Sequence, residues 1–383
     1  MVNRFVLNET SYHGAGAIAN IAVEAKNRAF KKAFVCSDPD LIKFGVTKKV
    51  LDVLDKDGLA YEVYDNIKPN PTIENVQSGV AAFKKSGADY LIAIGGGSSM
   101  DTAKAIGIII NNPEFADVRS LEGVAPTKKP AVPIIAVPTT AGTAAEVTIN
   151  YVITDVEKNR KMVCVDPHDI PVVAVVDPEM MASMPKGLTA ATGMDALTHA
   201  VEAYIGHSNT KGTAEAAEKA TRLIFDNILT AYENGKDLKA RENMLVASYL
   251  AGIAFTRAYV GYVHAIAHNL GGMYGTPHGL ANAVILPYVL EYYGSTAAAP
   301  LAKLADIAGL ETNGMNDAQK AALFIEKIKE FNRKMNIPEH LEILEKDIPT
   351  IAKRALREGN PLYPVPKIMD YDDCVSVIKR IAK

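Results

Sequence analysis

The first half of the chain alternates short runs of β-branched and apolar residues with longer segments of helical periodicity. Strand-like runs lie at residues 32–38, 61–64, 90–94, 132–137, 161–165 and 172–176. Two clear segments with helical spacing of apolar residues lie at 72–86 and 101–111. Strand and helix repeated in this way are the sequence form of a parallel sheet with helices on its faces. We therefore predict a Rossmann-like α/β domain.

The pattern changes from Met181 onward. Ala, Leu, Glu and Lys dominate there, apolar residues recur every three or four positions, and no convincing strand pattern follows. We place a domain boundary near residues 183–185. Residues 1–183 are then expected to form an α/β dinucleotide-binding domain, and residues 184–383 an all-helical domain.

Composition and charge narrow the class of protein. A chain of 383 residues exceeds the size at which one hydrophobic core stops growing, so two domains are expected. The chain holds 41 basic and 44 acidic residues, a balance that argues against a nucleic-acid or membrane-surface partner. It has neither a signal-like start nor an uninterrupted apolar stretch long enough to span a membrane, so we expect a cytoplasmic protein. Its 3 cysteines show no C-x-x-C spacing and are expected to be buried, reduced thiols.

A glycine turn follows the apolar run at 90–94. Gly95, Gly96 and Gly97 precede Ser98 and the next helical segment. Glycines let the backbone approach a pyrophosphate closely, and a helix start attracts its charge. The turn matches neither the G-x-G-x-x-G fingerprint nor a Walker loop. Glycine also serves tight strand-to-helix turns for steric reasons alone, so ligand binding and simple chain reversal both explain it.

A threonine-rich segment follows the run at 132–137, at the sheet edge where open α/β folds bind ligands. The hydroxyls of Thr139, Thr140 and Thr143 could hold phosphate, ribose and amide groups. Alternatively, Thr143 and Glu146 could form a capping box at the start of a helix. The two interpretations are compatible, because a helix terminus at a cleft can serve both.

Asp38 ends the run at 32–38. A carboxylate there can accept hydrogen bonds from ribose hydroxyls and would repel a 2′-phosphate, which favours NAD over NADP. The alternative is an ordinary aspartate in the turn at residues 37–40.

Histidines and one aspartate are spaced for metal binding in the second half. Asp195 and His199 lie four residues apart on one predicted helix, and His264 and His268 lie four apart on another. His278 follows in a turn that leads into a further helix. Burial of an imidazole without a partner costs hydration free energy that no other interaction offsets. The cluster of histidines therefore indicates a metal site. Oxygen and imidazole ligands suit Fe(II) or Zn(II) and do not separate the two. The other histidines are expected to be structural or at the surface: His13, His168, His207 and His340.

These residues resemble those of the iron-containing, group III alcohol dehydrogenases. The resemblance covers essentially the whole chain and rests on the glycine turn with Asp101, the segments 138–148 and 191–199, and the three histidines from 264 to 278. It implies the fold of that family and of dehydroquinate synthase, in which an α/β domain precedes an all-α, metal-binding domain. It also implies NAD and iron as cofactors and a homodimer.

The resemblance also implies which residues of this chain bind the cofactor, the metal and the substrate. It implies NAD contacts at Asp38, Asn70, Gly96, Gly97, Ser98, Thr139, Thr140, Thr143, Thr148 and Lys161, with Leu188 near the cofactor. It implies iron on Asp195, His199, His264 and His278. His268 would face the substrate and nicotinamide, and its place one helical turn from His264 suits proton delivery. Asn150 and Phe255 match positions that line the substrate pocket.

Segments 111–123 and 164–171 are similar to the subgroup of the family that interconverts lactaldehyde and 1,2-propanediol. The resemblance therefore implies an oxidoreductase of short-chain primary alcohols or diols and aldehydes. Residues 359–366 depart from that subgroup, and pocket shape sets discrimination among short alcohols. Butanol, ethanol or 1,3-propanediol therefore stay open as substrates. A zinc-dependent enzyme similar to glycerol dehydrogenase and a catalytically idle nucleotide-binding protein are further alternatives.

Overall fold

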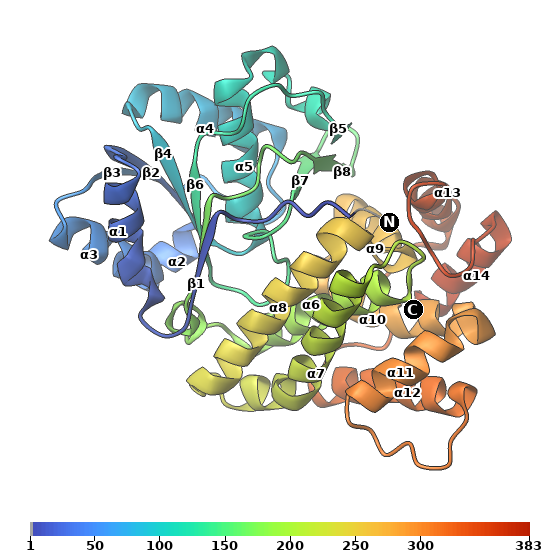
Figure 1. Ribbon diagram of the computed structural model, residues 1–383. Coiled ribbons are helices and arrows are strands. Elements are labelled where there is room, and N and C mark those ends of the chain that lie inside the picture. Colours follow the sequence, from blue (N-terminus) through green and yellow to red (C-terminus); the bar gives the residue numbers. More distant parts are fainter. Residues whose placement is uncertain (1–2) are drawn as a thin grey trace. The chain divides into compact units, whose positions relative to one another are not determined.

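The computed structural model describes residues 3–383, which fall into two compact units. One unit is Phe5–Met184, and the other is Pro185–Lys383 together with residues 3–4. The first, coloured blue to green in Figure 1, contains the strands, and the second is built from helices. The predicted fold class, an α/β region followed by an all-α region, is confirmed.

A six-stranded parallel sheet forms the centre of the α/β unit. Its strands are β1 (Thr10–His13), β2 (Lys32–Ser37), β3 (Ala60–Tyr64), β4 (Tyr90–Gly95), β6 (Ile134–Pro138) and β9 (Val173–Val176). They lie in the order β1-β9-β6-β4-β2-β3, and each neighbouring pair is parallel. The chain turns outward from β2 to β3 and then crosses back to β4. In open sheets, ligands bind outside the carboxyl ends of the strands at such a reversal.

Helices cover both faces of this sheet. They are η1 (Ala17–Ala19), α1 (Asn20–Asn27), α2 (Pro39–Lys43), α3 (Val46–Lys56), α4 (Ile73–Ser86) and α5 (Gly97–Asn111). Val35 and Ile92 pack in one core cluster with residues of α1 and α3, whereas Phe34 and Leu91 pack in another with residues of α4 and α5. Successive strand residues point to opposite faces, so both faces are buried and the strands read as continuous apolar runs.

A smaller sheet and short helices complete the α/β unit. These elements are η2 (Pro113–Phe115), η3 (Val118–Leu121), β5 (Gly123–Val124), β7 (Asn150–Asp155), β8 (Arg160–Val165) and η4 (Pro178–Met181). The strand order is β5-β8-β7, with β7 and β8 antiparallel.

The helix predicted to start at Thr143 is absent: residues 139–149, all of them described, form bends and turns. The capping box is therefore wrong. Ala144 takes a left-handed φ of 52°, which is incompatible with a regular helix start. The Glu146 side chain is buried, and its Oε1 has no hydrogen-bond partner among the described residues.

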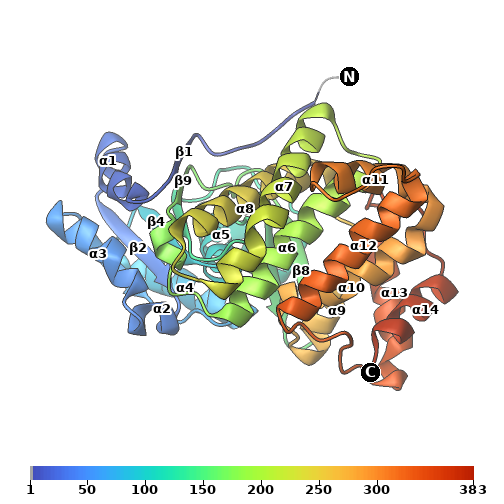
Figure 2. The ribbon, with the colours of Figure 1, turned by 90° about the horizontal axis from the view of Figure 1, so that it is seen from below.

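The helical unit positions the histidine cluster. Its helices are α6 (Lys186–Ile205), α7 (Lys211–Glu233), α8 (Leu238–Ala258), α9 (Tyr262–Tyr274), α10 (His278–Tyr293), η5 (Gly294–Ala297), α11 (Ala298–Ile307), α12 (Asp317–Lys334), η6 (Glu345–Asp347), α13 (Ile348–Gly359) and α14 (Tyr371–Ile381). Helix α6 is buried over most of its length, and its buried residues include the polar side chains of Asp195, His199 and Glu202. Helix α10 packs against both α6 and α9 (Figure 2). The three helices that carry the candidate ligands therefore form one packed group.

The structure bears on two expectations from the sequence, which concern membrane-spanning segments and the state of the cysteines. Within residues 3–383, no single helix is long and apolar enough to cross a membrane, and only the pair α8 and α9, bent by 103°, passes that test together. Cys36, Cys164 and Cys374 are all buried and free of disulfides.

Candidate metal centre and nucleotide-binding edge

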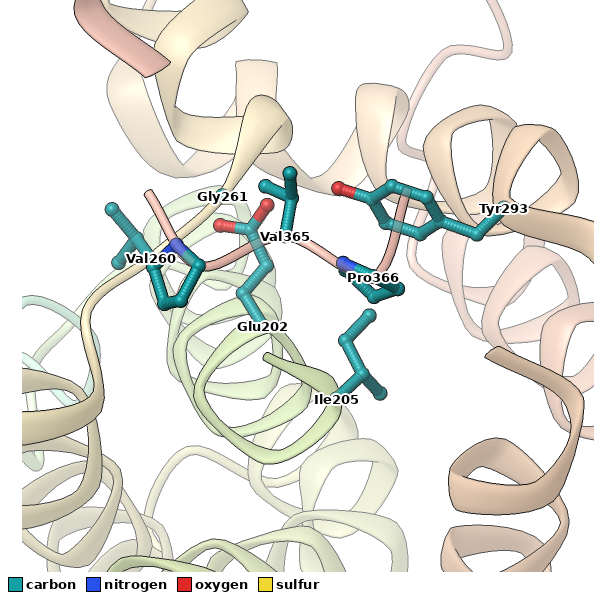
Figure 3. A pocket seen from close by; sticks show the side chains of 8 residues that line it. Glu202, Ile205, Val260, Gly261, Tyr293, Val365 and Pro366 are labelled. Carbon is teal, nitrogen blue, oxygen red and sulfur yellow. The ribbon is translucent and has the colours of Figure 1, made fainter. Parts of the chain in front are cut away.

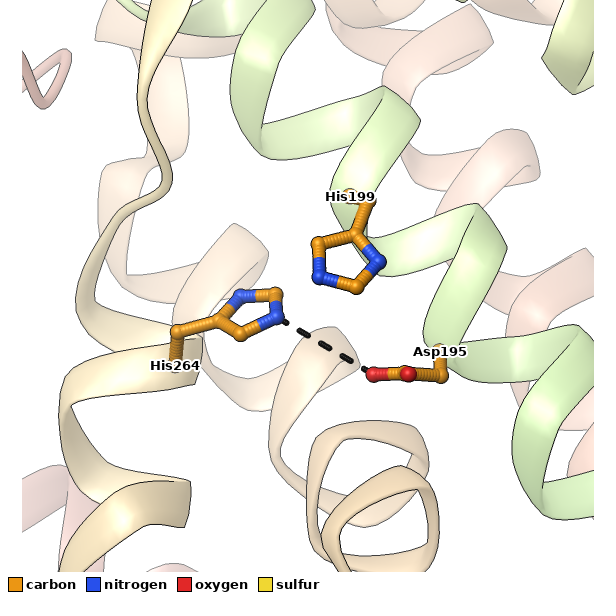
Figure 4. Close-up of side chains that lie close together, drawn as sticks. All are labelled: Asp195, His199 and His264. Atoms are coloured by element: carbon orange, nitrogen blue, oxygen red, sulfur yellow. Dashed lines mark ion pairs between the residues drawn. The ribbon is translucent and has the colours of Figure 1, made fainter. Parts of the chain in front are cut away.

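Three of the predicted ligands converge inside the helical unit. Helix α6 presents Asp195 and His199 on one face, and α9 presents His264 opposite them (Figure 4). One potential ligand atom from each residue lies within 4.8 Å of the others, and all three side chains are buried. The rings of His199 and His264 are stacked, with centroids 4.4 Å apart.

His278, the first residue of α10, reaches the same carboxylate. Its Nε2 lies 3.6 Å from Asp195 Oδ1, and Nε2 of His264 lies 4.0 Å from that oxygen. His268 lies beside this group, with its ring centroid 6.0 Å from that of His264 and 5.2 Å from that of His278. The five residues singled out from their spacing therefore lie together.

The side-chain amide of Asn282, on α10, occupies the point on which the potential ligand atoms of Asp195, His264 and His278 converge. Its Nδ2 donates to Asp195 Oδ1 over 2.6 Å and lies 3.1 Å and 3.2 Å from Nε2 of His264 and His278. An amide carries two N–H groups, so three lone pairs compete for them. Its Oδ1 is buried without a hydrogen-bond partner. Such a concentration of acceptors fits a cation, and one carboxylate with imidazole nitrogens fits Fe(II) or Zn(II).

A buried carboxylate orients His264 from behind. Glu202, on α6, accepts a hydrogen bond from His264 Nδ1 over 2.6 Å and from the Val263 N–H over 2.8 Å. Burial opposes protonation of His264. The hydrogen bond to Glu202 and the charge of Glu202 outweigh this effect, so the pKa of His264 is raised. Carboxylates in this place fix the orientation of metal-binding histidines and increase their basicity.

The side chain of Glu202 is only 2 % exposed. Ile205, Val260, Tyr293 and Val365 line a small pocket beside it (Figure 3). A Cβ added at Gly261 would lie 2.7 Å from Glu202 Oε1, so the absence of a side chain there makes room for the carboxylate. Sequence reasoning missed both Glu202 and Asn282. The available signals were that Asn282 follows His278 by four residues and that Glu202 follows His199 by three, which places each pair on one helix face.

Phe255, one of the two predicted substrate residues, borders the cluster. It lies on α8 and stacks on His199, with ring centroids 4.1 Å apart and planes at 14°. It contacts one face of a candidate ligand and is almost completely buried. The other predicted substrate residue, Asn150, begins β7 in the α/β unit.

The glycine turn and the threonine segment pack directly on each other in the α/β unit. Helix α5 begins at Gly97, four residues before the predicted start. A Cβ at Gly96 would lie 3.0 Å from Thr140 Oγ1, and one at Gly97 would lie 3.0 Å from Thr143 Cγ2. The two predicted cofactor segments therefore share one edge of the sheet, after β4 and β6. The amides at the start of α5 are suited to binding an anion there.

Asp38 caps a helix instead of ending its strand. Strand β2 ends at Ser37, and Asp38 Oδ1 accepts the Leu41 N–H at the start of α2 over 2.9 Å. The side chain is partly exposed at the carboxyl end of β2, next to β4. Asn70, in the loop between β3 and α4, is partly exposed with a φ of 55°.

A buried lysine that sequence reasoning missed supports this edge. Lys104 Nζ donates to the carbonyls of Thr148 over 2.5 Å and Asn150 over 2.9 Å. It also lies 3.8 Å from Asp169 Oδ1, and both side chains are fully buried. Burial raises the pKa of Asp101 and that of Glu146 to about 7. The start of β7 is thus fixed by a cation in an otherwise acidic interior.

The remaining predicted residues have simple positions. Lys161 is partly exposed on β8. Leu188 lies on α6 of the helical unit and is 44 % exposed. The four histidines expected outside the cluster are exposed or partly exposed: His13, His168, His207 and His340.

The chain is similar in sequence and in fold to known proteins of one family. Residues 8–178 match the family described as iron-containing alcohol dehydrogenase, and residues 189–382 match the C-terminal part of the Fe-containing alcohol dehydrogenase family. Lactaldehyde reductase of Escherichia coli (strain K12) is 50 % identical over 368 residues, which cover 94 % of this chain and 96 % of that protein. The 1,3-propanediol dehydrogenase of Citrobacter freundii is 42 % identical, over 93 % of each chain. A crystal structure of a 1,3-propanediol oxidoreductase superposes over 100 % of both chains with a TM-score of 0.95 and 38 % identity.

Proposed function

The chain belongs to the family of iron-containing alcohol dehydrogenases, and we propose that within it the protein interconverts lactaldehyde and 1,2-propanediol. At the level of the family, it is an NAD- and metal-dependent oxidoreductase of alcohols and aldehydes. The substrate proposal is supported by 50 % identity to the lactaldehyde reductase of Escherichia coli. The alternative is supported by 42 % identity to a 1,3-propanediol dehydrogenase.

The observation that carries the reaction type is the convergence of acceptor atoms on Asn282. We propose that Asp195, His199, His264 and His278 hold one Fe(II), with Zn(II) as the alternative metal. A divalent ion bound there supplies Lewis acidity, which polarises a carbonyl oxygen and makes an alcohol more acidic. Glu202 holds His264 with Nδ1 protonated, so that Nε2 keeps the lone pair a metal requires.

The two units divide the remaining tasks. In the α/β unit, the start of α5 and the threonine segment bind the pyrophosphate of NAD, and Asp38 accepts hydrogen bonds from the adenosine ribose. The charge of Asp38 disfavours the 2′-phosphate of NADP. In the helical unit, His268 delivers the proton that the reduced oxygen needs, and Phe255 shields one side of the site.

A panel of aldehydes tests this proposal. Protein purified without oxygen is loaded with Fe(II) or Zn(II), and oxidation of NADH or NADPH is followed with lactaldehyde, glycolaldehyde, 3-hydroxypropanal and butanal. We expect the highest kcat/KM with Fe(II), NADH and lactaldehyde. A higher value with 3-hydroxypropanal would move the substrate to 1,3-propanediol, and a higher value with Zn(II) would replace the metal. Absence of NADH oxidation with every aldehyde would refute the reaction.

Asp38 gives a separate test of cofactor choice. Asp38→Asn keeps a hydrogen-bonding side chain but removes the charge that repels a 2′-phosphate, so the ratio of kcat/KM for NADH over NADPH should fall. An unchanged ratio would leave Asp38 with its capping role alone.

Homodimer formation and a cytoplasmic location stay predictions from the sequence.

A further inference from the structure

His268 hydrogen-bonds to a carboxylate that no sequence motif indicated. Its Nδ1 lies 2.7 Å from Oε1 of Glu358, near the end of α13. The hydroxyl of Tyr363 donates to the same oxygen over 2.8 Å. The side chains of His268 and Glu358 are 8 % and 22 % exposed. This pair is therefore sheltered from the screening and competition by water that weaken exposed ion pairs.

The backbone around Glu358 is tied to the helix that carries His268. A Cβ at Gly359 would lie 2.9 Å from the ring of Tyr262, the first residue of α9, so glycine permits this close approach. The Tyr262 hydroxyl donates to Asn360 Oδ1 over 2.6 Å. The Tyr363 N–H donates to the Gly359 carbonyl over 2.7 Å, which places the Tyr363 ring beside Glu358. These contacts fix the carboxylate on both sides.

A carboxylate at this distance determines which ring nitrogen carries the hydrogen. Neutral imidazole has one N–H donor and one acceptor nitrogen, whereas an ionised carboxylate can only accept. With Glu358 against Nδ1, the hydrogen of neutral His268 lies on Nδ1, and Nε2 keeps its lone pair. Without that acceptor, the ring could hold its hydrogen on either nitrogen and could rotate.

We propose that Glu358 is a positioning residue for the reaction, which holds His268 as the Nδ1–H tautomer in one ring orientation, and that Tyr363 in turn holds Glu358. The proposal rests on the proposed function, in which Nε2 of His268 exchanges a proton with the substrate oxygen. Glu358 and Tyr363 act only through His268. Tyr363 lies within residues 359–366, where the chain departs from the lactaldehyde-reducing subgroup, and Glu358 directly precedes that stretch.

The competing explanation is that the hydrogen bond between Glu358 and His268 only stabilises the packing of α13 against α9. The chain offers a matched control, because the bond from Tyr262 to Asn360 joins the same two parts without touching His268. Asn360→Ala removes that tie and leaves the pair of Glu358 and His268. If Glu358 has only a structural role, Glu358→Ala and Asn360→Ala should affect the protein in the same way.

The first readout is spectroscopic and independent of turnover. Long-range ¹H–¹⁵N spectra of histidine-labelled protein loaded with diamagnetic Zn(II) distinguish protonated from unprotonated ring nitrogens, and the spectrum of His268→Ala assigns the His268 signals. We expect a protonated Nδ1 and an unprotonated Nε2 in the wild type, in Glu358→Gln and in Asn360→Ala. We expect a mixture of tautomers in Glu358→Ala. A wild-type ring protonated on Nε2, or an unchanged spectrum in Glu358→Ala, would overturn the proposal.

The second readout is kinetic. Glu358→Ala should lower kcat about 10- to 100-fold, the loss that follows removal of the partner that orients a metal-ligating histidine, with KM for the aldehyde nearly unchanged. Glu358→Gln keeps an acceptor oxygen and should recover most of kcat, and Tyr363→Phe should give an intermediate loss. A Glu358→Gln variant as slow as Glu358→Ala, or an equal loss of kcat in Asn360→Ala, would refute the positioning role.

The two proposals fail in different ways. If the wild type oxidises no NADH with any aldehyde, or if His268→Ala is fully active, the proposed function is wrong while the tautomer spectra still test the placement of Glu358. If the wild type is active and Glu358→Ala keeps both tautomer and kcat, only the positioning role is wrong.

Discussion

Replacing Glu202 by glutamine should weaken metal binding without removing any ligand. The wild-type carboxylate uses both oxygens: Oε1 accepts the Val263 N–H over 2.8 Å, and Oε2 accepts from His264 Nδ1 over 2.6 Å. Glutamine has nearly the same shape but only one acceptor oxygen. Its NH₂ group must therefore face one of the two donors, and one of these bonds is lost.

The geometry sets the size of the effect. If the amide faces His264, the ring can restore a hydrogen bond only by moving its hydrogen to Nε2, which removes the lone pair that points toward Asp195. If the amide faces Val263, a buried N–H is left unsatisfied, at a cost of about 1–3 kcal/mol. In both cases the negative charge behind His264 is gone. Loss of such a partner lowers metal affinity about 10- to 100-fold, or ~1.4–2.8 kcal/mol.

The assay is competition for Zn(II) with a chromogenic chelator, with the thermal midpoint of the metal-free protein measured in parallel. Glu218→Gln is the matched control, because Glu218 accepts from Tyr204 and pairs with Lys303 on the same unit. We expect the dissociation constant to rise at least about tenfold in Glu202→Gln and to stay unchanged in Glu218→Gln. A dissociation constant for Glu202→Gln equal to that of the wild type would refute the role assigned to Glu202.

Three further predictions concern the α/β unit. Gly97→Ala places a Cβ 3.0 Å from Thr143 Cγ2, so steady-state kinetics should show a raised KM for NADH with unchanged metal content; an unchanged KM would contradict the packing of the two segments. Lys104→Met leaves the buried Thr148 carbonyl without its donor, so thermal melting should show a loss of about 1–3 kcal/mol, and wild-type stability would count against the contact. Burial raises the pKa of Glu146 from its usual 4.5 to about 7, so between these values the folded chain binds more protons than the unfolded chain, and stability falls as pH rises through that window. Glu146→Gln should therefore reduce the loss of thermal stability between about pH 5 and 8, by an amount on the order of 3 kcal/mol, and an unchanged loss would contradict the shift.

The order of elements in the α/β unit could be predicted because strands buried on both faces leave continuous apolar runs. Strand β1 has four residues with alternating partly exposed and exposed side chains, and no such run marks it. The capping-box signal at Thr143 was misleading because it is purely local. Packing instead buries Glu146 and holds Ala144 in a left-handed conformation, so the turn is determined by tertiary structure.

The candidate ligands could be predicted from spacing because helical periodicity brings residues four apart onto one face. The hydrogen-bond partners of His264, Asp195 and His268 could not, because each partner comes from a distant part of the chain. Glu202 and His264 are 62 residues apart, Asn282 and Asp195 are 87 apart, and Glu358 and His268 are 90 apart. Each is an ordinary polar residue of a helix until the packing of α6, α9, α10 and α13 gives it a partner.

Metal content measured on matched variants tests the central claim most directly. Protein reconstituted with Fe(II) without oxygen is analysed by mass spectrometry for iron per chain, in the wild type, in His264→Ala and in His268→Ala. These histidines lie one turn apart on α9, but we assign the first to the metal and the second to the proton. We predict one iron per chain in the wild type and in His268→Ala, and none in His264→Ala. Full iron in His264→Ala, or loss of iron in His268→Ala, would contradict the account.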